Sequence, residues 1–493
     1  MTVAPPLSLV AWLDSVVAAH GRRVALADDG VNVTYDEMWA TAGGVANYLR
    51  TDLDAELGAR IAIIGTNQAA YIEAFLGILR GGLVAVPLNP MLDTRSLRAQ
   101  LEALDASILI LGEVDDDVRE GLCGVLPIVE LPRLLADSEA HFGKLPLPRP
   151  ASPACIIPTS GSTGLPKGAL HTQSGLLHCA LQIGGALPLG PSDRNVSFLP
   201  FFAAIPEQVL PTLCAGGAVE VIARFDVERI AAACARATCF DAVPTIMSRL
   251  INEAPLESLR QLNWVYFASE PMPPALLARW HEELPGVETH QFYGMTELVP
   301  ATVASHRILL TDRTTVGVPF PTTRVTRDPE SGELFTRSPA QMSGYFNNAA
   351  ATRAALTPEG AIRTGDVGEF DELGRLHLTS RLKDLIITGG LNVAPSEIEA
   401  VACHHPSIGV AAVVGIPDER WGETPIVVGV ARDGATVSAA DLLAHCRQSL
   451  KGFKRPSGAA IVDVLPSTGI GKVAKQLLRD QIVKGEIDLV RAG

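Results

Sequence analysis

The sequence predicts an α/β fold with a parallel sheet. A buried strand (Arg60–Gly65), a helix (Asn67–Arg80) and a second strand (Leu83–Leu88) follow one another directly. A strand, a helix and a strand within about thirty residues form a βαβ unit, whose two strands are parallel. The strand pattern recurs at Ser107–Leu111 and Val219–Ile222. At roughly 100–200 residues a domain, the 493 residues correspond to about two to four domains.

The composition excludes several classes of protein. The net charge is −14, which argues against non-specific binding to nucleic acid or to an anionic membrane surface. No long uncharged apolar run occurs, so we expect no membrane span. The apolar N-terminal stretch lacks basic residues and is interrupted by Asp14, so we expect no signal peptide. The eight cysteines are scattered without a CxxC pair, which favours reduced thiols and a cytoplasmic location.

The strongest local motif is a glycine- and hydroxyl-rich loop. The stretch from Thr159 to Gly168 reads TSGSTGLPKG and follows a short apolar strand, Ala154–Ile157. Glycines allow the backbone to approach a ligand closely, and backbone N–H groups, hydroxyls and Lys167 suit phosphate oxygens. The spacing differs from a Walker A loop, because Lys167 follows a proline and no GxxxxGK[ST] pattern is present. Such a stretch alone is also compatible with a flexible surface loop, so other motifs are needed.

This loop resembles the signature loop of the adenylate-forming superfamily, which includes acyl-CoA synthetases and 4-coumarate-CoA-ligase-like AMP-binding enzymes. Further stretches match motifs of the superfamily in the same order, so chance similarity is excluded. These stretches are Phe292–Glu297 (FYGMTE), Thr364–Asp366 (TGD), Arg381–Asp384 (RLKD), Gly389–Val393 (GGLNV) and Leu465–Lys472 (LPSTGIGK).

The resemblance implies two domains. A large N-terminal α/β domain of several subdomains, residues 1–382, is expected to bind AMP and carry out adenylation. A small mobile α+β domain, residues 383–493, is expected to carry the catalytic lysine and the loop of the CoA channel. Lys383 occupies the position of the hinge between them.

The resemblance also implies ATP and Mg²⁺ as cofactors and assigns roles to individual residues. Lys472 is expected to bridge the α-phosphate and the substrate carboxylate, Thr296 to contact the α-phosphate, and Glu297 to hold Mg²⁺, a hard cation that prefers carboxylate oxygens. The residues expected to bind ATP or AMP are Thr159, Ser160, Gly161, Ser162, Thr163, Lys167, Ser269, Glu270, Pro271, Tyr293, Gly294, Asp366 and Arg381.

Each of these residues also has a purely structural interpretation. An aspartate such as Asp366 caps turns, and an acid such as Glu297 stabilises helix starts. A lysine such as Lys472 is most often solvated. Their order along the chain favours the functional interpretation.

A second set of residues is expected to serve coenzyme A. Gly389 and Gly390 have no side chain to block a narrow pantetheine channel, although a plain β-turn is the structural alternative. Lys454 belongs to a basic cluster between Lys451 and Arg479, which holds six basic residues and one acid and is a candidate to bind CoA phosphates. A solvated helix face explains such a cluster equally well.

The acyl pocket is expected to be apolar. Its predicted residues are Phe201, Ala203, Ala204, Val243, Met295 and Val299. Ala203 occupies a position where the superfamily often has a histidine or aromatic residue, and a methyl group there opens volume unless a neighbour refills it. These features favour a hydrophobic aryl, fatty or polycyclic acid. Asp241 leaves open a minor possibility, an amino acid whose ammonium group it would bind.

These observations predict an acyl-CoA ligase that forms a thioester from a carboxylic acid, ATP and CoA through an acyl-adenylate. Its partners would be the small-molecule acid and CoA, and the protein would be a monomer or homodimer. Two other enzyme functions stay open: delivery of the acyl group to a carrier protein, and a single half-reaction on a preformed acyl-adenylate. A non-catalytic sensor of nucleotide or acyl-CoA is a different class of function, and the retained charged residues argue against it.

Overall fold

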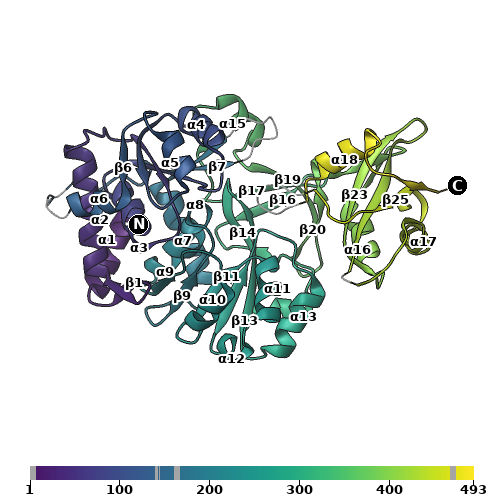
Figure 1. Ribbon diagram of the computed structural model, residues 1–493, viewed down its shortest axis with the longest axis horizontal. Coiled ribbons are helices and arrows are strands. Elements are labelled where there is room, and N and C mark those ends of the chain that lie inside the picture. Colours follow the sequence, from purple (N-terminus) through teal and green to yellow (C-terminus); the bar gives the residue numbers. More distant parts are fainter. Residues whose placement is uncertain are drawn as a thin grey trace. The chain divides into compact units, whose positions relative to one another are not determined.

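The structure is a computed structural model that describes residues 7–138, 141, 143, 145–159, 167–432, 434–466 and 473–492. Packing divides the chain into two compact units, coloured along the sequence in Figure 1. The first contains Met1–Val325 and Phe335–Arg363, and the second contains Thr326–Leu334 and Thr364–Gly493. None of the described helices is long and apolar enough to cross a membrane.

A seven-stranded sheet in the first unit has the order β18-β8-β7-β4-β3-β5-β6. Its strands are β3 (Arg60–Ile64), β4 (Val84–Leu88), β5 (Ala106–Leu111), β6 (Ile128–Glu130), β7 (Pro153–Thr159), β8 (Lys167–Thr172) and β18 (Gly344–Tyr345). The strands from β6 to β7 are parallel, whereas β8 is antiparallel to both of its neighbours. The accompanying helices are α3 (Ala69–Arg80), α4 (Thr94–Ala103), α5 (Asp116–Leu122) and α6 (Leu131–Ser138).

A nine-stranded sheet in the same unit has the order β15-β14-β13-β12-β11-β9-β10-β1-β2. Its strands are β1 (Val24–Asp28), β2 (Val31–Thr34), β9 (Arg194–Ser197), β10 (Ala218–Val221), β11 (Cys239–Ala242), β12 (Trp264–Phe267), β13 (Glu288–Met295), β14 (Leu298–Ala304) and β15 (Val318–Pro319). Its central strands, from β1 to β13, are parallel, and the outer ones are antiparallel.

The other helices of this unit lie between and after these strands. They are α1 (Leu9–His20), α2 (Tyr35–Thr51), α7 (Gln173–Ala186), α8 (Phe201–Ala204), the π-helical turn η1 (Ile205–Val209), α9 (Leu210–Cys214), α10 (Val227–Cys234), α11 (Pro244–Glu253), α12 (Leu256–Leu259), α13 (Pro274–Glu283), α14 (His306–Thr311) and α15 (Ala349–Ala355).

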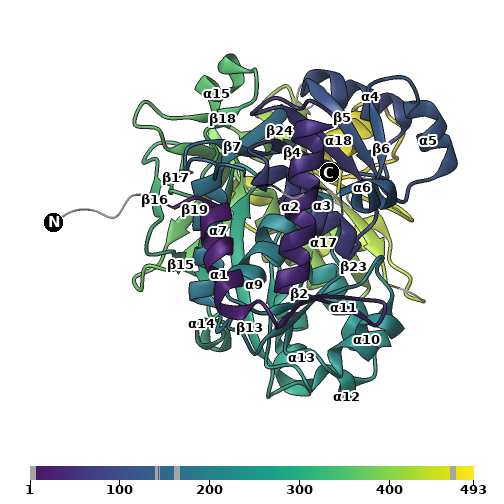
Figure 2. The ribbon, with the colours of Figure 1, turned by 90° about the vertical axis from the view of Figure 1, so that its left-hand side faces the viewer.

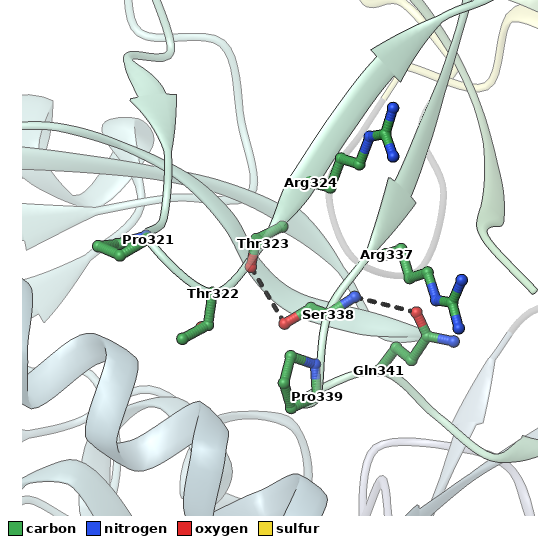
Figure 3. Close-up of a pocket in the computed structure, with 8 residues that line it drawn as sticks. All are labelled: Pro321, Thr322, Thr323, Arg324, Arg337, Ser338, Pro339 and Gln341. Carbon is green, nitrogen blue, oxygen red and sulfur yellow. Dashed lines mark hydrogen bonds between the residues drawn. The ribbon is translucent and has the colours of Figure 1, made fainter.

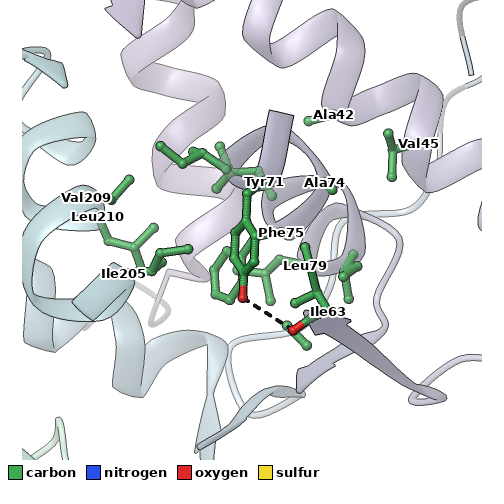
Figure 4. Close-up of a cluster of buried hydrophobic side chains, with 14 of the residues drawn as sticks. Ala42, Val45, Ile63, Tyr71, Ala74, Phe75, Leu79, Ile205, Val209 and Leu210 are labelled. Atoms are coloured by element: carbon green, nitrogen blue, oxygen red, sulfur yellow. Dashed lines mark hydrogen bonds between the residues drawn. The ribbon is translucent and has the colours of Figure 1, made fainter. Parts of the chain in front are cut away.

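Helices α2 and α3 lie side by side (Figure 2) and contribute to a large apolar core. Helix α2 begins with a capping box, in which Thr34 and Glu37 satisfy each other's backbone N–H groups. Figure 4 shows Tyr71 of α3 inside this core, where its hydroxyl donates to the carbonyl of Ile63 at 3.4 Å. Residues of η1 and α9 pack into the same core, which fixes the segment after α8 against α3.

The second unit combines sheets and a few helices. A four-stranded sheet has the order β16-β17-β19-β20, with strands β16 (Arg324–Arg327), β17 (Glu333–Arg337), β19 (Ile362–Phe370) and β20 (Leu376–Arg381), and the division between the units falls within the first three. A further sheet has the order β22-β21-β24-β25-β26, with β23 paired to β24. Its strands are β21 (Ile386–Thr388), β22 (Leu391–Val393), β23 (Ile408–Asp418), β24 (Gly422–Ala431), β25 (Gly458–Ile461) and β26 (Val490–Arg491). The helical segments are η2 (Leu382–Asp384), α16 (Pro395–Cys403), α17 (Ala439–Ser449), η3 (Gly452–Lys454) and α18 (Lys475–Val483).

The predicted α/β class, with a large N-terminal part and a smaller C-terminal part, is confirmed. The βαβ unit forms where the pattern predicts it, as β3, α3 and β4, and its strands are parallel. The predicted domain boundary at residue 382 lies in η2, later than the last division between the compact units. The predicted boundary marks the hinge about which the C-terminal domain would rotate, whereas the compact units are defined by packing. The boundary at residue 382 therefore stays a prediction.

Candidate active site

The predicted phosphate loop connects two adjacent antiparallel strands. Thr159 ends β7, Lys167 begins β8, and the two residues lie opposite each other in the ladder. The Thr159 hydroxyl donates to the Lys167 carbonyl at 3.3 Å. A Cβ on Gly168, the second residue of β8, would lie 2.3 Å from the Ile156 side chain, so glycine lets the strand pack closely against β7 there. The predicted ligands Ser160, Gly161, Ser162 and Thr163 lie outside the described residues.

Lys167, Tyr345 and Glu297 form a contiguous cluster in the first unit. Strand β18 pairs with β8 so that Tyr345 lies opposite Ala169, beside the start of the strand. The Lys167 ammonium lies 5.4 Å from the centre of the Tyr345 ring, a cation–π contact. The Tyr345 hydroxyl donates to Oε1 of Glu297 at 2.5 Å. The tyrosine therefore separates the cation from the carboxylate.

The turn that carries Thr296 and Glu297 is fixed through its backbone. His171 Nε2 donates to the Thr296 carbonyl at 2.9 Å, and the Met342 N–H donates to the Glu297 carbonyl at 2.8 Å. Burial lowers the pKa of His171 to about 4, so the imidazole is neutral at physiological pH and carries its proton on Nε2. These contacts fix the backbone of the turn, and the Tyr345 hydroxyl holds its buried carboxylate. Such a carboxylate suits Mg²⁺, which prefers carboxylate and phosphate oxygens.

The predicted adenine-contacting residues lie at the ends of neighbouring strands. Ser269 follows β12 and has a φ of 72°, an uncommon conformation for a residue other than glycine. The Glu270 carboxylate accepts hydrogen bonds from the N–H and hydroxyl of Thr245 at 3.2 and 2.7 Å, and Pro271 follows it in the same turn. Tyr293 lies on β13 near this edge and is buried, whereas Gly294 after it is exposed.

The predicted ribose-binding residues form an ion pair in the second unit. Asp366 on β19 lies opposite Arg381 on β20, and Arg381 Nε donates to Asp366 Oδ1 at 2.8 Å. Asp366 is buried, while the Arg381 side chain is half exposed. The antiparallel register thus brings together two residues that the sequence analysis assigned to one ligand. Lys383, the predicted hinge, is exposed in η2. Lys472, the predicted catalytic lysine, lies outside the described residues.

Gly389 and Gly390 form the turn of the hairpin between β21 and β22. Their φ values are 58° and 79°, as a two-residue turn of the type favoured in hairpins requires. The Gly389 N–H donates to the Trp421 carbonyl at 2.7 Å. A Cβ on Gly389 would lie 3.0 Å from the Trp421 ring, whereas a Cβ on Gly390 would meet nothing within 4 Å.

Three of the six residues of the basic cluster pair with acids of their own unit. Lys454 forms an ion pair with Glu397. Lys475 pairs with Glu399 at 2.7 Å, and Arg479 pairs with Glu423 at 2.8 Å. A CoA phosphate would therefore have to compete with Glu397 for Lys454.

The residues predicted for the acyl pocket differ in exposure. Phe201 is buried in the core, with its ring 5.9 Å from that of Tyr71. Ala203 is exposed, Ala204 is buried, and Val243, Met295 and Val299 are half-buried.

Two features of the first unit have no counterpart in the predicted set. Tyr345 contacts both Lys167 and Glu297, although only its pairing in the sheet brings it there. Glu207 lies in η1, directly after α8, and interacts electrostatically with Asp241 of β11, the acid that the sequence left open as an ammonium ligand; burial raises the pKa of both. No local sequence pattern marks either feature.

A cavity of about 600 Å³ lies elsewhere on the first unit (Figure 3). Its wall is stabilised by hydrogen bonds from Thr323 to Ser338 at 3.0 Å and from the Ser338 N–H to Gln341 at 3.1 Å. None of the predicted site residues lines it, so we do not identify it with the active site. The lining residues are Pro321, Thr322, Thr323, Arg324, Arg337, Ser338, Pro339 and Gln341.

Comparisons with known proteins identify the family of the chain. Residues 13–346 match the family model described as AMP-binding enzyme, and residues 397–472 match the AMP-binding enzyme C-terminal domain. A feruloyl-CoA synthase of Amycolatopsis sp is 33% identical over 477 residues, which cover 92% of this chain and 95% of that protein. The 4-coumarate–CoA ligase-like 9 of Oryza sativa subsp. japonica is 30% identical over 508 residues, covering 94% and 91%.

Solved structures show the same fold. ATP-bound MatB from Rhodopseudomonas palustris superposes with a TM-score of 0.87 at 27% identity, covering 96% of this chain and 99% of that one. The o-succinylbenzoate-CoA synthetase MenE from Bacillus subtilis, in complex with ATP and magnesium ion, gives a TM-score of 0.85 at 26% identity, covering 95% and 99%.

Proposed function

Since this chain belongs to the AMP-binding enzyme family, in which it is an ATP-dependent, AMP-forming CoA ligase, we propose that it converts a hydrophobic carboxylic acid into an acyl-CoA through an acyl-adenylate. The single observation that carries the two-step mechanism is the cluster of Lys167, Tyr345 and Glu297 at the base of the phosphate loop. The Tyr345 ring contacts the Lys167 cation and its hydroxyl holds the Glu297 carboxylate, an arrangement that suits the binding of a metal–triphosphate.

In the first step a carboxylate oxygen of the acid attacks the α-phosphorus of ATP, and the bond to pyrophosphate breaks. Lys167 and the loop before it would hold the β- and γ-phosphates, and Thr296 would contact the α-phosphate. Mg²⁺, held by Glu297, would neutralise part of the triphosphate charge. Lys472 would bridge the α-phosphate and the attacking carboxylate. Because two anions must meet, this step depends mainly on positioning and charge neutralisation.

The ribose and the adenine would be held by separate groups. Asp366 would accept hydrogen bonds from the ribose hydroxyls while Arg381 orients its carboxylate at 2.8 Å. The turn of Ser269, Glu270 and Pro271 would contact the adenine, and Tyr293 would stack on it. These assignments rest on the motifs and on the positions of the residues at strand ends.

In the second step the thiol of CoA attacks the acyl carbon, the thiol proton is lost to solvent, and AMP leaves. Gly389 and Gly390 would leave room for the pantetheine arm, Lys454 would bind a CoA phosphate, and Lys383 would act as the hinge. The acid would occupy a pocket near Ala203 and Val243. The cytoplasmic location and the monomeric or dimeric state stay predictions from the sequence.

The decisive experiment is incubation of the protein with ATP, Mg²⁺, CoA and a pool of carboxylic acids, with the products identified by mass spectrometry. We expect an acyl-CoA, together with AMP. An acyl-AMP without the thioester would instead indicate a carrier protein as acceptor. Absence of both products would contradict the proposal, and a preformed acyl-adenylate supplied with CoA would then test for a single half-reaction.

A variant pair tests the role of the catalytic lysine. Lys472→Ala is expected to lose acyl-AMP formation, measured as pyrophosphate release without CoA. Lys475→Ala is the matched control, because Lys475 is a nearby lysine already paired with Glu399. Equal activity of the two variants would contradict the assignment.

A further inference from the structure

The cavity of about 600 Å³ is lined entirely by residues of the first unit and by none of the predicted site residues. Cavities of roughly 300–1,000 Å³ are typical of sites that bind small organic molecules. Thr323 and Ser338 line it from inside the protein, since only 7% and 6% of their surfaces are exposed. The base of the cavity is therefore polar, and its lining indicates which kind of molecule fits.

The lining carries two positive charges and no negative charge. Arg324 of β16 and Arg337 of β17 extend from neighbouring strands of one sheet. Neither guanidinium group forms an ion pair or a side-chain hydrogen bond with any residue that the structure describes. In a chain with a net charge of −14, two such arginines on neighbouring strands indicate a place for an anion.

Two hydroxyl groups of the lining have a proton to offer to a ligand. The Ser338 oxygen accepts hydrogen bonds from the Thr323 hydroxyl at 3.0 Å and from the Ala340 N–H at 3.2 Å. The Thr322 oxygen accepts one from the side-chain amide of the buried Gln182. Within the described part of the chain, neither hydroxyl has an acceptor for its own proton. Buried hydroxyls usually have such an acceptor, and an anion in the cavity would supply it to Ser338.

The two ends of the cavity differ in chemistry. In Figure 3 the two arginines lie on one side of the lining and Pro321 and Pro339 lie on the other, with Ser338 between them. Both prolines are exposed, so their rings offer apolar surface to a molecule that fills the cavity. A ligand with an anionic group at one end and a compact apolar body at the other matches both ends.

We propose that this cavity is a second ligand site, separate from the active site, and that it binds a small organic phosphate monoester. Arg324 and Arg337 bind the phosphate oxygens, and the hydroxyls of Thr322 and Ser338 donate further hydrogen bonds to them. The organic body contacts the two prolines. This inference does not depend on the proposed function, because none of these residues belongs to the predicted catalytic set.

A phosphate group fits this lining better than a carboxylate. A planar carboxylate is satisfied by a single arginine, which binds both of its oxygens side by side. A phosphate monoester has three terminal oxygens around its phosphorus and carries close to two negative charges near neutral pH. Two guanidinium groups on neighbouring strands, with two hydroxyls in the same lining, suit that shape and that charge.

A ligand in this cavity would stabilise the segment that leads to the candidate active site. The Ser338 N–H donates to Gln341 Oε1 at 3.1 Å. The next residue, Met342, donates its N–H to the Glu297 carbonyl at 2.8 Å, and Tyr345 follows three positions later. A ligand that binds only the folded form stabilises that form by mass action, so the melting temperature gives a second measure of binding.

The test measures the binding of phenyl phosphate by isothermal titration calorimetry, with saturating ATP and Mg²⁺ and without a carboxylic acid. The bound nucleotide then keeps the probe away from the phosphate loop. We expect phenyl phosphate to bind at least about tenfold more tightly than benzoate, because charge-assisted hydrogen bonds to a phosphate engage both arginines. It should also bind more tightly than inorganic phosphate, which lacks the apolar body.

Two variants locate the site. The double variant Arg324→Gln, Arg337→Gln should weaken the binding of phenyl phosphate at least about tenfold and abolish its effect on the melting temperature. Ser338→Ala keeps both charges and should weaken binding by a smaller factor. The matched control is the double variant Arg307→Gln, Arg353→Gln, which removes two exposed arginines of the same unit outside the cavity and should bind phenyl phosphate as the wild type does.

Several results would overturn the proposal. They are no binding of phenyl phosphate to the wild type, equal binding of benzoate, and equal binding by the wild type and the variant at Arg324 and Arg337. Equal weakening in the matched control would show that only the overall charge matters, and it would also overturn the proposal. The melting temperatures without ligand show whether each variant folds. Failure of the wild type to form any acyl-CoA would refute the proposed function alone.

Discussion

The Tyr345 hydroxyl donates a 2.5 Å hydrogen bond to Oε1 of Glu297, while the ring of the same tyrosine lies against the Lys167 ammonium at 5.4 Å. On the proposed mechanism, Tyr345 would keep the Lys167 cation available for phosphate and the Glu297 carboxylate available for a metal, and it would be a positioning residue for the first step.

Tyr345→Phe should raise the Mg²⁺ concentration needed for half-maximal pyrophosphate release by about tenfold, a magnitude typical of groups that orient a metal ligand. The phenyl ring keeps the contact with Lys167 but no longer fixes the carboxylate of Glu297. Titration of Mg²⁺ at saturating ATP measures the effect. Tyr48→Phe is the control, because its hydroxyl contacts Asp137 at 3.4 Å away from the site. An unchanged Mg²⁺ midpoint would refute the role of the hydroxyl.

Asp366→Asn should raise the KM for ATP by about tenfold. The amide loses the charge that attracts Arg381 and accepts hydrogen bonds from ribose hydroxyls less strongly, and hydrogen bonds to charged groups contribute about 1.5–3 kcal/mol. Steady-state kinetics at varied ATP tests this expectation. Asp371→Asn removes a comparable pair with Arg375, at 2.6 Å, and should leave the KM unchanged. Equal effects of the two substitutions would show that the charge acts only on folding.

Gly389→Ala should slow the CoA-dependent step by about tenfold or more and leave acyl-AMP formation intact. An added methyl group would lie 3.0 Å from the Trp421 ring, on a residue whose φ of 58° is costly for alanine by about 1–2 kcal/mol. Gly390→Ala carries only the backbone cost, because its Cβ meets nothing within 4 Å, and should be milder. Pyrophosphate release in the absence of CoA measures the first step. The yield of acyl-CoA measures the second. A parallel loss in both would argue against a role in the CoA channel.

Glu73→Gln should change the free energy of unfolding more favourably at pH 8 than at pH 5. Burial raises the pKa of Glu73 in α3 from 4.5 to about 7, so the folded state binds more protons than the unfolded state between these values. The stability contributed by this group is fully present below pH 4.5 and is lost as the pH rises through 7, by up to roughly 3 kcal/mol. Glutamine has no such dependence. Denaturant unfolding of both proteins at the two pH values measures the difference, and a constant difference would disprove the assignment.

The sequence predicted those features of the fold and the site whose residues lie close together along the chain. The βαβ unit from β3 to β4 follows from hydrophobic periodicity within thirty residues, and its strands pair as expected. Asp366 and Arg381 were assigned to one ligand by resemblance, and the β19–β20 register joins them. Each of these features lies within a short stretch of chain.

The environments of Tyr345 and Glu207 depend on long-range structure. Tyr345 reaches Glu297 only because β18 pairs with β8, and no spacing in the sequence encodes that pairing. The depth of Glu207 depends on how η1 packs over the nine-stranded sheet, since an acid in a helical stretch is usually solvated. For Lys454 the local sequence was misleading in the opposite way. Its neighbours along the chain are basic and suggested a free cation, but its ion-pair partner Glu397 lies 57 positions earlier.

The pairing of β18 with β8 also has a consequence during synthesis. Ser343 hydrogen-bonds to Leu170, which lies 173 positions earlier, so a growing chain displays the unpaired edge of β8 until this late segment leaves the ribosome. Open strand edges promote association between nascent chains. The segment that brings Tyr345 to Lys167 and Glu297 thus also pairs with β8, and we expect a chain truncated before residue 344 to lose solubility.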